Sequence, residues 1–170
     1  ALAWGSCATY AAAPGCGAAA PGQMDLADLV RIYRPLDLRR DARLYALAGW
    51  PLAHTQTPSF FNPWLERAGL PDRYVPFPCT DPRDLIHSGL PLEGVAVTVP
   101  HKETALQLAA RSSRLARTAG ACNTLLPGTD ADGWLATNTD VWGVRCALRR
   151  VTAGSRTLLL GCGGAACAAA

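Results

Sequence analysis

The chain has 170 residues, of which 49% are hydrophobic and 17% are charged, and its formal net charge is +3. These values are typical of a globular protein long enough to bury one substantial core. The sequence contains no Lys/Arg block and no apolar run near the roughly 20 residues of a membrane span, so neither nucleic acid nor a membrane is an expected partner.

The cysteines and histidines of the sequence do not predict a metal site. The seven cysteines are odd in number and form no Cys-x-x-Cys unit, and the three histidines are scattered. A disulfide framework or a zinc site therefore does not follow, and we expect reduced cysteines used as small apolar residues. No signal peptide is recognisable at the start, so we expect a cytoplasmic protein, with a plastid as the alternative if the host is photosynthetic.

The first 43 residues predict little regular structure. Residues 8–13 are short and apolar and predict a strand, and a Gly/Ala/Pro-rich loop follows. Asp25 is a good helix cap, apolar residues recur at helical spacing over 26–33, and Pro35 ends the helix. The charged, aperiodic stretch 36–43 is typical of a linker.

From residue 44 onward, strands alternate with helices. Strands are predicted at 44–48, 74–77 and 95–99, and helices at 57–69, 81–87 and from residue 102. In the first of these helices we expect Thr57 to cap and Pro63 to cause a kink or a short first turn. The apolar face is expected to be formed by Phe60, Phe61, Trp64 and Leu65. A helix after each strand favours an α/β fold with an open, mainly parallel sheet and helices on both faces.

The last third of the sequence predicts a hairpin and then a second alternation. Residues 121–126 and 134–137 are strands joined by a turn-rich loop, and 141–150 are helical. A short apolar strand is predicted at 156–160, followed by a glycine-rich turn at 161–165.

Polar residues of suitable kinds follow several of these strands. Hydroxyl, amide, amine and carboxyl groups occur at strand ends: Thr55, Thr57, Thr98, Lys102, Asn123 and Asp140. In open α/β sheets ligands bind at this edge, where hydroxyls and amides can hold a hydroxylated or carboxylated molecule. Lys102 and Asp140 could share a proton transfer. Each residue also has a simple structural reading: a solvated lysine, a helix cap at Thr57 or Asp140, and a turn residue at Asn123.

The glycine-rich turn suggests a phosphate site. Gly161, Cys162, Gly163, Gly164 and Ala165 follow an apolar strand and precede an Ala-rich helical start. Glycines let the backbone approach a pyrophosphate, and a helix N-terminus favours its charge.

These motifs together resemble shikimate dehydrogenase. The resemblance rests on GWPLAHTQTP at 49–58, VTVPHKE at 97–103, GACNT at 120–124, NTD at 138–140 and GCGGA at 161–165. Threonines stand at 55 and 57 where that family has two serines, which keeps both hydroxyls. Ala96, Pro63 and Ala136 depart from the family pattern, and none of them removes the pair formed by Lys102 and Asp140.

The resemblance implies an NADP-dependent oxidoreductase that reversibly reduces 3-dehydroshikimate to shikimate in chorismate biosynthesis. It implies that Lys102 and Asp140 are catalytic and that both also contact the substrate. It further implies that Thr55 and Thr57 hold the carboxylate, that Thr98 and Asn123 orient ring hydroxyls, and that residues 161–165 bind the phosphates of NADP. Quinate dehydrogenase, which shares the scaffold, and a non-catalytic substrate-binding module remain the alternatives.

Residues 1–35 resemble a different enzyme, the C-terminal end of type I 3-dehydroquinate dehydratase, which is a (β/α)8 barrel. GSCATY at 5–10 and APGQ at 20–23 carry this shorter match, and Gln23 corresponds to a substrate-contacting glutamine. The resulting prediction is a barrel remnant at 1–35, a linker at 36–43, a substrate domain at 44–150 and the truncated start of a Rossmann domain at 151–170. We expect a fragment of a bifunctional dehydratase–dehydrogenase, inactive by itself, with no prediction of its oligomeric state.

Overall fold

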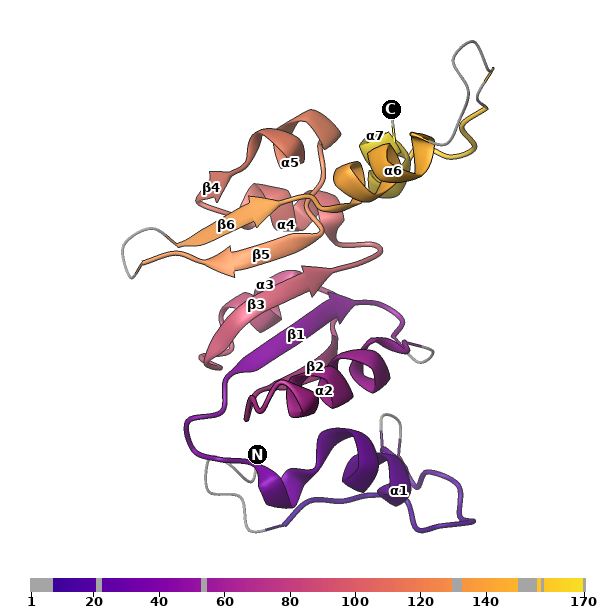
Figure 1. The fold of residues 1–170 in the computed structure, drawn as a ribbon, viewed down its shortest axis with the longest axis vertical. Helices are drawn as coiled ribbons and strands as arrows, with labels where there is room; N and C mark the ends of the chain where they lie inside the picture. The colour runs from indigo at the N-terminus through magenta and orange to yellow at the C-terminus, as the bar shows by residue number, and fades with distance from the viewer. Residues whose placement is uncertain are drawn as a thin grey trace. The chain divides into compact units, whose positions relative to one another are not determined.

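The computed structural model describes residues 8–20, 23–52, 55–129, 133–149, 156 and 158–169. The fold is mixed α/β, with a six-stranded sheet in the order β2-β1-β3-β5-β6-β4 (Figure 1). The chain divides into two compact units, one of residues 1–45 and 52–76 and the other of residues 46–51 and 77–170. The α/β class predicted from the alternation of strands and helices is confirmed.

In the first unit, the predicted helix after Asp25 is present but irregular. Asp25 Oδ1 accepts a hydrogen bond from Ala27 N–H and caps α1 (Leu26–Asp28), which continues as a π-helix, η2 (Leu29–Tyr33). The left-handed Arg34, with φ of 41°, ends this helix before the 3-10 turn η3 (Pro35–Asp37). The strand predicted at 8–13 is wrong: Ala12 forms a single parallel bridge with Asp25, and one bridge does not make a ladder.

Of the predicted apolar face of helix α2 (Thr57–Arg67), only Leu65 is buried. The buried residues of the helix are Pro58, Asn62 and Leu65, whereas Phe60 and Trp64 are 68% and 51% exposed. The apolar pattern misleads here because a buried amide at Asn62 bonds both backbone groups of Tyr74. The helix continues through Pro63 and ends before Gly69, whose φ of 71° is the left-handed conformation expected after a helix.

Neighbouring chain segments in this unit bond to each other. Strand β2 (Arg73–Pro78) begins at Arg73, whose Nε donates to Tyr33 O at 2.9 Å. Arg34 forms an ion pair with Glu66 on α2. These contacts attach residues 26–37 to α2 and to the start of β2.

In the second unit, strand β3 is central. β1 (Leu44–Gly49) and β3 (Leu92–Val97) run in the same direction, and the hairpin of β5 (Thr124–Pro127) and β6 (Trp134–Thr137) lies beyond β3 (Figure 1). β5 is antiparallel to both β3 and β6, and the two-residue strand β4 (Arg111–Ser112) is parallel to β6. The predicted hairpin is confirmed, whereas β4 was not predicted.

The helices of this unit are short. They are α3 (Pro82–Ile86), α4 (Lys102–Leu108), α5 (Arg114–Ala119), α6 (Asp140–Leu148) and α7 (Gly164–Ala169). The helices α3, α4 and α6 were predicted within a few residues, whereas α5 was not predicted as a separate helix. α4 and α6 matter most, because each begins where a sheet strand has just ended.

Two predicted strands differ from the observed structure. β3 ends at Val97, two residues before the predicted end, and Val99 is 66% exposed in the turn that follows. At 156 and 158–160 no strand is formed, and Leu158 and Leu160 are 81% and 84% exposed. A strand requires a hydrogen-bonding neighbour, and in the described part of the chain no strand pairs with these residues.

The core of the second unit lies over β3 and β5. Val95 and Leu125 are opposite each other in the ladder and are each 1% exposed. Ala105 on α4 and Ala136 on β6 are fully buried. Small residues therefore let α4 and the hairpin approach closely, and this packing fixes where the polar ends of β3, β5 and β6 lie. Within the described residues, no helix is long and apolar enough to cross a membrane.

Candidate active site

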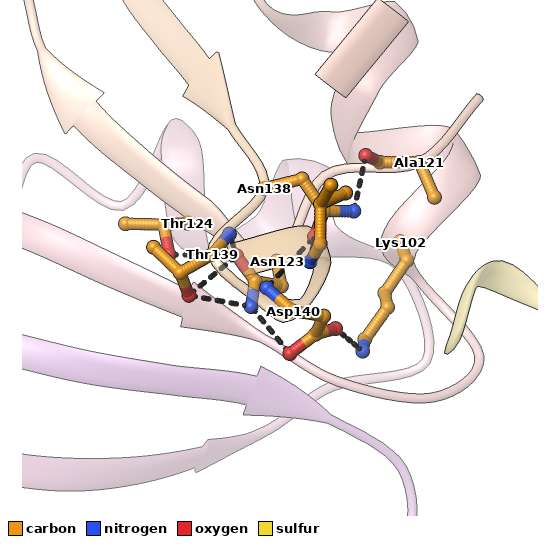
Figure 2. A network of polar contacts seen from close by, with 8 residues as sticks. Lys102, Ala121, Asn123, Thr124, Asn138, Thr139 and Asp140 are labelled. Atoms are coloured by element: carbon orange, nitrogen blue, oxygen red, sulfur yellow. Dashed lines mark hydrogen bonds and ion pairs between the residues drawn. The ribbon is translucent and has the colours of Figure 1, made fainter. Parts of the chain in front are cut away.

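Two helix starts bring Lys102 and Asp140 into contact. Lys102 is the first residue of α4 and Asp140 the first residue of α6. Lys102 Nζ lies 2.6 Å from Asp140 Oδ2, and the two side chains are 18% and 33% exposed (Figure 2). The contact predicted between these residues is thus present, as a partly buried ion pair open to solvent on one side.

Lys102 is also the only lysine in the sequence, since the other fifteen of the sixteen Lys and Arg residues are arginines. A guanidinium does not lose its proton in proteins, whereas an ammonium can. Among the cationic Lys and Arg side chains of this chain, only Lys102 can therefore take part in proton transfer.

Asn123 holds the second oxygen of the carboxylate. Its Nδ2 donates to Asp140 Oδ1 at 2.8 Å and to Thr139 Oγ1 at 2.9 Å (Figure 2). Its Oδ1 accepts from Thr139 N–H at 2.9 Å, and a backbone N–H can only donate, so the orientation of the amide is fixed. Each oxygen of Asp140 therefore faces one donor.

Backbone hydrogen bonds hold this group of residues in place. Cys122 N–H donates to Lys102 O at 2.8 Å, and Asn123 N–H donates to Thr137 O at 3.1 Å. Asn123 O accepts from Val97 N–H at 2.8 Å. Asn123 is consequently anchored between the ends of β3 and β6, directly beside the start of α4.

Thr98 and His101 lie in the turn between β3 and α4. Thr98 is half-buried, and its carbonyl accepts from His101 N–H at 2.9 Å. His101 is 4% exposed, and its Nε2 lies 2.7 Å from Cys79 O, which makes it a structural residue. No cluster of three or more His, Cys, Asp or Glu among the described residues could hold a metal ion.

In the first unit, Thr55 and Thr57 bring their hydroxyls together. Thr55 Oγ1 donates to Thr57 Oγ1 at 3.0 Å and accepts from Thr57 N–H at 3.3 Å. The expectation that Thr57 caps α2 is wrong: Thr57 is the first helical residue, and Gln56 occupies the cap position without a capping hydrogen bond from its side chain. The preceding residues 53–54 of the motif lie outside the described residues.

The glycine-rich turn leads into α7. Gly161 has φ of 121°, a conformation that favours glycine, and a Cβ added at Gly163 would have nothing within 4 Å. Gly164 is crowded, because an added Cβ would lie 3.0 Å from Ala121 Cβ and 3.2 Å from Lys102 Cβ. Residues 161–163 and Ala165 are exposed. Open backbone at 161–163 is compatible with a phosphate, whereas Gly164 is needed for close packing on Lys102.

One thiol beside the site is unreactive in character. Cys122 is fully buried between Ala121 and Asn123, and its Sγ contacts Thr124 O at 3.2 Å. Burial raises the pKa of the Cys122 thiol. Cys122 therefore serves as a small core residue and not as a nucleophile.

The arrangement can hold and exchange a proton on a bound hydroxyl group. An ammonium with a carboxylate partner, open to solvent on one side, is suited to general acid–base chemistry. Asn138 and Thr139 were not among the predicted site residues, although both bond within this network. Their signal in the sequence was the position of the NTD triplet between a strand and a helix, where polar side chains bond free backbone groups.

Comparison with known proteins points to one family. Residues 47–125 match the family model described as the shikimate dehydrogenase substrate binding domain. A protein of Syntrophobacter fumaroxidans named shikimate dehydrogenase (NADP(+)) is 40% identical over 131 residues, which cover 75% of this chain and 45% of that protein.

Solved structures of shikimate dehydrogenases are also similar to this chain. A shikimate dehydrogenase of Peptoclostridium difficile is 28% identical, with a TM-score of 0.66 over 75% of this chain and 50% of that one. A shikimate 5-dehydrogenase of Thermus thermophilus in complex with NADP(H) and shikimate is 31% identical, with a TM-score of 0.64 over 74% of this chain and 49% of that one. The chain thus spans about half the length of the relatives that it matches.

Proposed function

We propose that this chain serves the NADP-dependent, reversible reduction of 3-dehydroshikimate to shikimate, because residues 47–125 match the model of the shikimate dehydrogenase substrate binding domain and a shikimate dehydrogenase (NADP(+)) is 40% identical over 131 residues. The observation that carries the proposal is the ion pair between Lys102 and Asp140, with Nζ and Oδ2 2.6 Å apart at two adjacent helix starts. A dehydrogenase acting on a carbinol needs one group that takes the hydroxyl proton and one that holds this group in position.

Lys102 is the proton-transfer residue in this mechanism. In the oxidation of shikimate, the neutral amine of Lys102 accepts the proton of the reacting hydroxyl and becomes the ammonium that is paired with Asp140. In the reverse direction this ammonium gives the proton to the carbonyl oxygen and returns to the neutral amine. Asp140 holds the amine through Oδ2, and Asn123 holds Asp140 through Oδ1. Because both oxygens of Asp140 have donors, the carboxylate stays fixed while the lysine exchanges its proton with the substrate.

The remaining substrate contacts are proposed from residue type and placement. Thr55 and Thr57 have adjacent hydroxyls, which are suited to donating to one carboxylate. Thr98 lies in the turn that precedes Lys102, and Asn123 lies beside Asp140. We assign Thr98 and Asn123 to the ring hydroxyls, so that the group nearest to Lys102 is the one that reacts.

The turn at 161–165 is proposed to contact the phosphates of NADP, which supplies the hydride acceptor. Gly161, Cys162 and Gly163 have exposed backbone, and the unusual φ of Gly161 requires glycine, so the turn fits a phosphate group. Ala165 follows at the first turn of α7. Gly164 supports the site indirectly, because its missing side chain lets α7 rest on the stem of Lys102.

A fusion to a dehydratase is proposed from the sequence alone. Its support is the match of residues 1–35, of which 1–7 and 21–22 lie outside the described residues. Gln23, the residue matched to a substrate contact, uses its Oε1 to accept from Ala19 N–H at 2.6 Å. A mass measurement of the native polypeptide tests the fusion, because a second enzyme domain would add far more than the 17.9 kDa of this chain.

Substitution of Lys102 tests the proposed function. In the native polypeptide as its host makes it, Lys102→Ala should abolish most shikimate-dependent NADPH formation and leave much of the shikimate affinity, measured by calorimetric titration. Lys102→Arg is the matched control, because it keeps the positive charge beside Asp140 and cannot give up a proton. We expect both variants to lose turnover, and turnover near the wild-type value in either one would refute the assignment.

A further inference from the structure

We propose that Asn138 is a positioning residue for Asp140: its buried amide fixes the start of α6 and thereby the carboxylate that holds Lys102. This inference rests on the proposed function, because it concerns the same proton-transfer pair. It concerns a side chain outside the predicted substrate and catalytic contacts, since Asn138 touches neither oxygen of Asp140.

The Asn138 side chain is completely buried, and both ends of its amide are hydrogen-bonded. It is 0% exposed, and its Nδ2 donates to Ala121 O at 2.8 Å (Figure 2). Its Oδ1 accepts from Asp140 N–H at 3.0 Å and from Val141 N–H at 3.4 Å. A buried amide with both ends bonded has one preferred orientation, because turning it would place donor against donor and acceptor against acceptor.

These bonds replace a missing helix cap. Thr139 stands at the cap position of α6 but makes no capping hydrogen bond with its side chain. The Thr139 hydroxyl is instead bonded to Asn123. Two free N–H groups of the first turn, those of Asp140 and Val141, are therefore satisfied by Asn138, one residue before the cap position.

The same side chain joins the two segments that form the site. Ala121 O belongs to the loop that leads through Cys122 to Asn123, and Asp140 belongs to the first turn of α6. Asn138 thus fixes the distance between these two segments. Their side chains are joined by the hydrogen bond from Asn123 Nδ2 to Asp140 Oδ1. Loss of the amide would free the backbone of Asp140 while leaving Lys102 and Asn123 chemically intact.

The test compares two buried asparagines. Asn62 is 2% exposed and bonds Tyr74 N–H and Tyr74 O at 2.7 Å and 2.9 Å, so Asn62→Ala removes a comparable buried amide in the first unit. The two alanine variants and Asn138→Ser are made in the native polypeptide. The measurements are the urea midpoint and kcat and KM for shikimate with NADP.

We expect Asn138→Ala to lower kcat roughly 10- to 100-fold with KM within about threefold, because displacement of a catalytic group acts on turnover. Asn138→Ser should recover part of this loss, since a serine hydroxyl can accept from helix N–H groups. Asn62→Ala should lower the urea midpoint as much as Asn138→Ala does and leave kcat near the wild-type value.

Equal kcat losses in the two alanine variants, or wild-type kcat in a folded Asn138→Ala protein, would overturn the inference and leave the proposed function standing. If Asn138→Ala does not fold, the kcat of Asn138→Ser is compared with the kcat of Asn62→Ala, and the same criteria apply. A wild-type protein without shikimate-dependent NADPH formation would instead refute the proposed function, and the inference with it.

Discussion

Replacing Asp140 by asparagine removes an acceptor at a point where two donors meet. Lys102 Nζ lies 2.6 Å from Oδ2, and Asn123 Nδ2 lies 2.8 Å from Oδ1. An asparagine has one oxygen and one NH₂ group, so it can accept from only one of these neighbours and must point its own donor at the other. The variant keeps the volume of the side chain, so its effect is one of charge and hydrogen bonding.

The magnitude follows from the lost charged contact. Hydrogen bonds to charged groups contribute about 1.5–3 kcal/mol, and about 1.4 kcal/mol of activation free energy corresponds to a tenfold change in rate. If the pair is needed in the transition state, Asp140→Asn should therefore lower kcat roughly 10- to 150-fold.

The assay is steady-state oxidation of shikimate with NADP by the native polypeptide. Asp81→Asn is the matched control, because Asp81 caps α3 at a partly exposed position and contacts Arg83 instead of Lys102. We expect kcat of this control to remain near the wild-type value. A kcat for Asp140→Asn within about threefold of wild type would refute the reasoning that the carboxylate is required as a double acceptor.

Two further predictions concern packing and thiol chemistry near Lys102. Gly164→Ala should destabilise the fold by about 1–3 kcal/mol in urea titration, because the added Cβ would crowd Lys102. Gly163→Ala is the control: it adds a Cβ into open space and should leave the free energy of unfolding near the wild-type value. Equal stabilities of the two variants would contradict the packing assigned to Gly164. At mildly alkaline pH, iodoacetamide should modify the exposed Cys162 much faster than Cys122, because burial limits access to the Cys122 thiol and raises its pKa. Peptide mass spectrometry measures the two rates of modification. Faster modification of Cys122 would contradict the burial described for it.

Local patterns predicted most of the elements that position the site. Strand β1, the hairpin of β5 and β6, and the helices that begin at Lys102 and Asp140 follow from apolar periodicity and turn residues. The contact of Lys102 with Asp140 was predictable because both stand just after strands in an α/β alternation.

The rest depends on tertiary contacts that a local pattern does not contain. Leu158 and Leu160 read as a strand, but a strand forms only with a neighbour to bond, and both are exposed. The aromatic residues of α2 were predicted to form its buried face. The buried position is instead taken by Asn62, which is hydrogen-bonded to the backbone of Tyr74. Asn138 was not predicted as a site residue, because its complete burial depends on the distant carbonyl of Ala121.

The most direct test of the central claim is NADPH formation by the native polypeptide with shikimate and with quinate as alternative substrates, each repeated with Lys102→Ala. The proposed function predicts rapid NADPH formation with shikimate, much slower formation with quinate, and loss of both in the variant. Faster turnover of quinate would assign the chain to quinate oxidation instead. Shikimate binding without any NADPH formation would contradict a dehydrogenase and indicate a substrate-binding module.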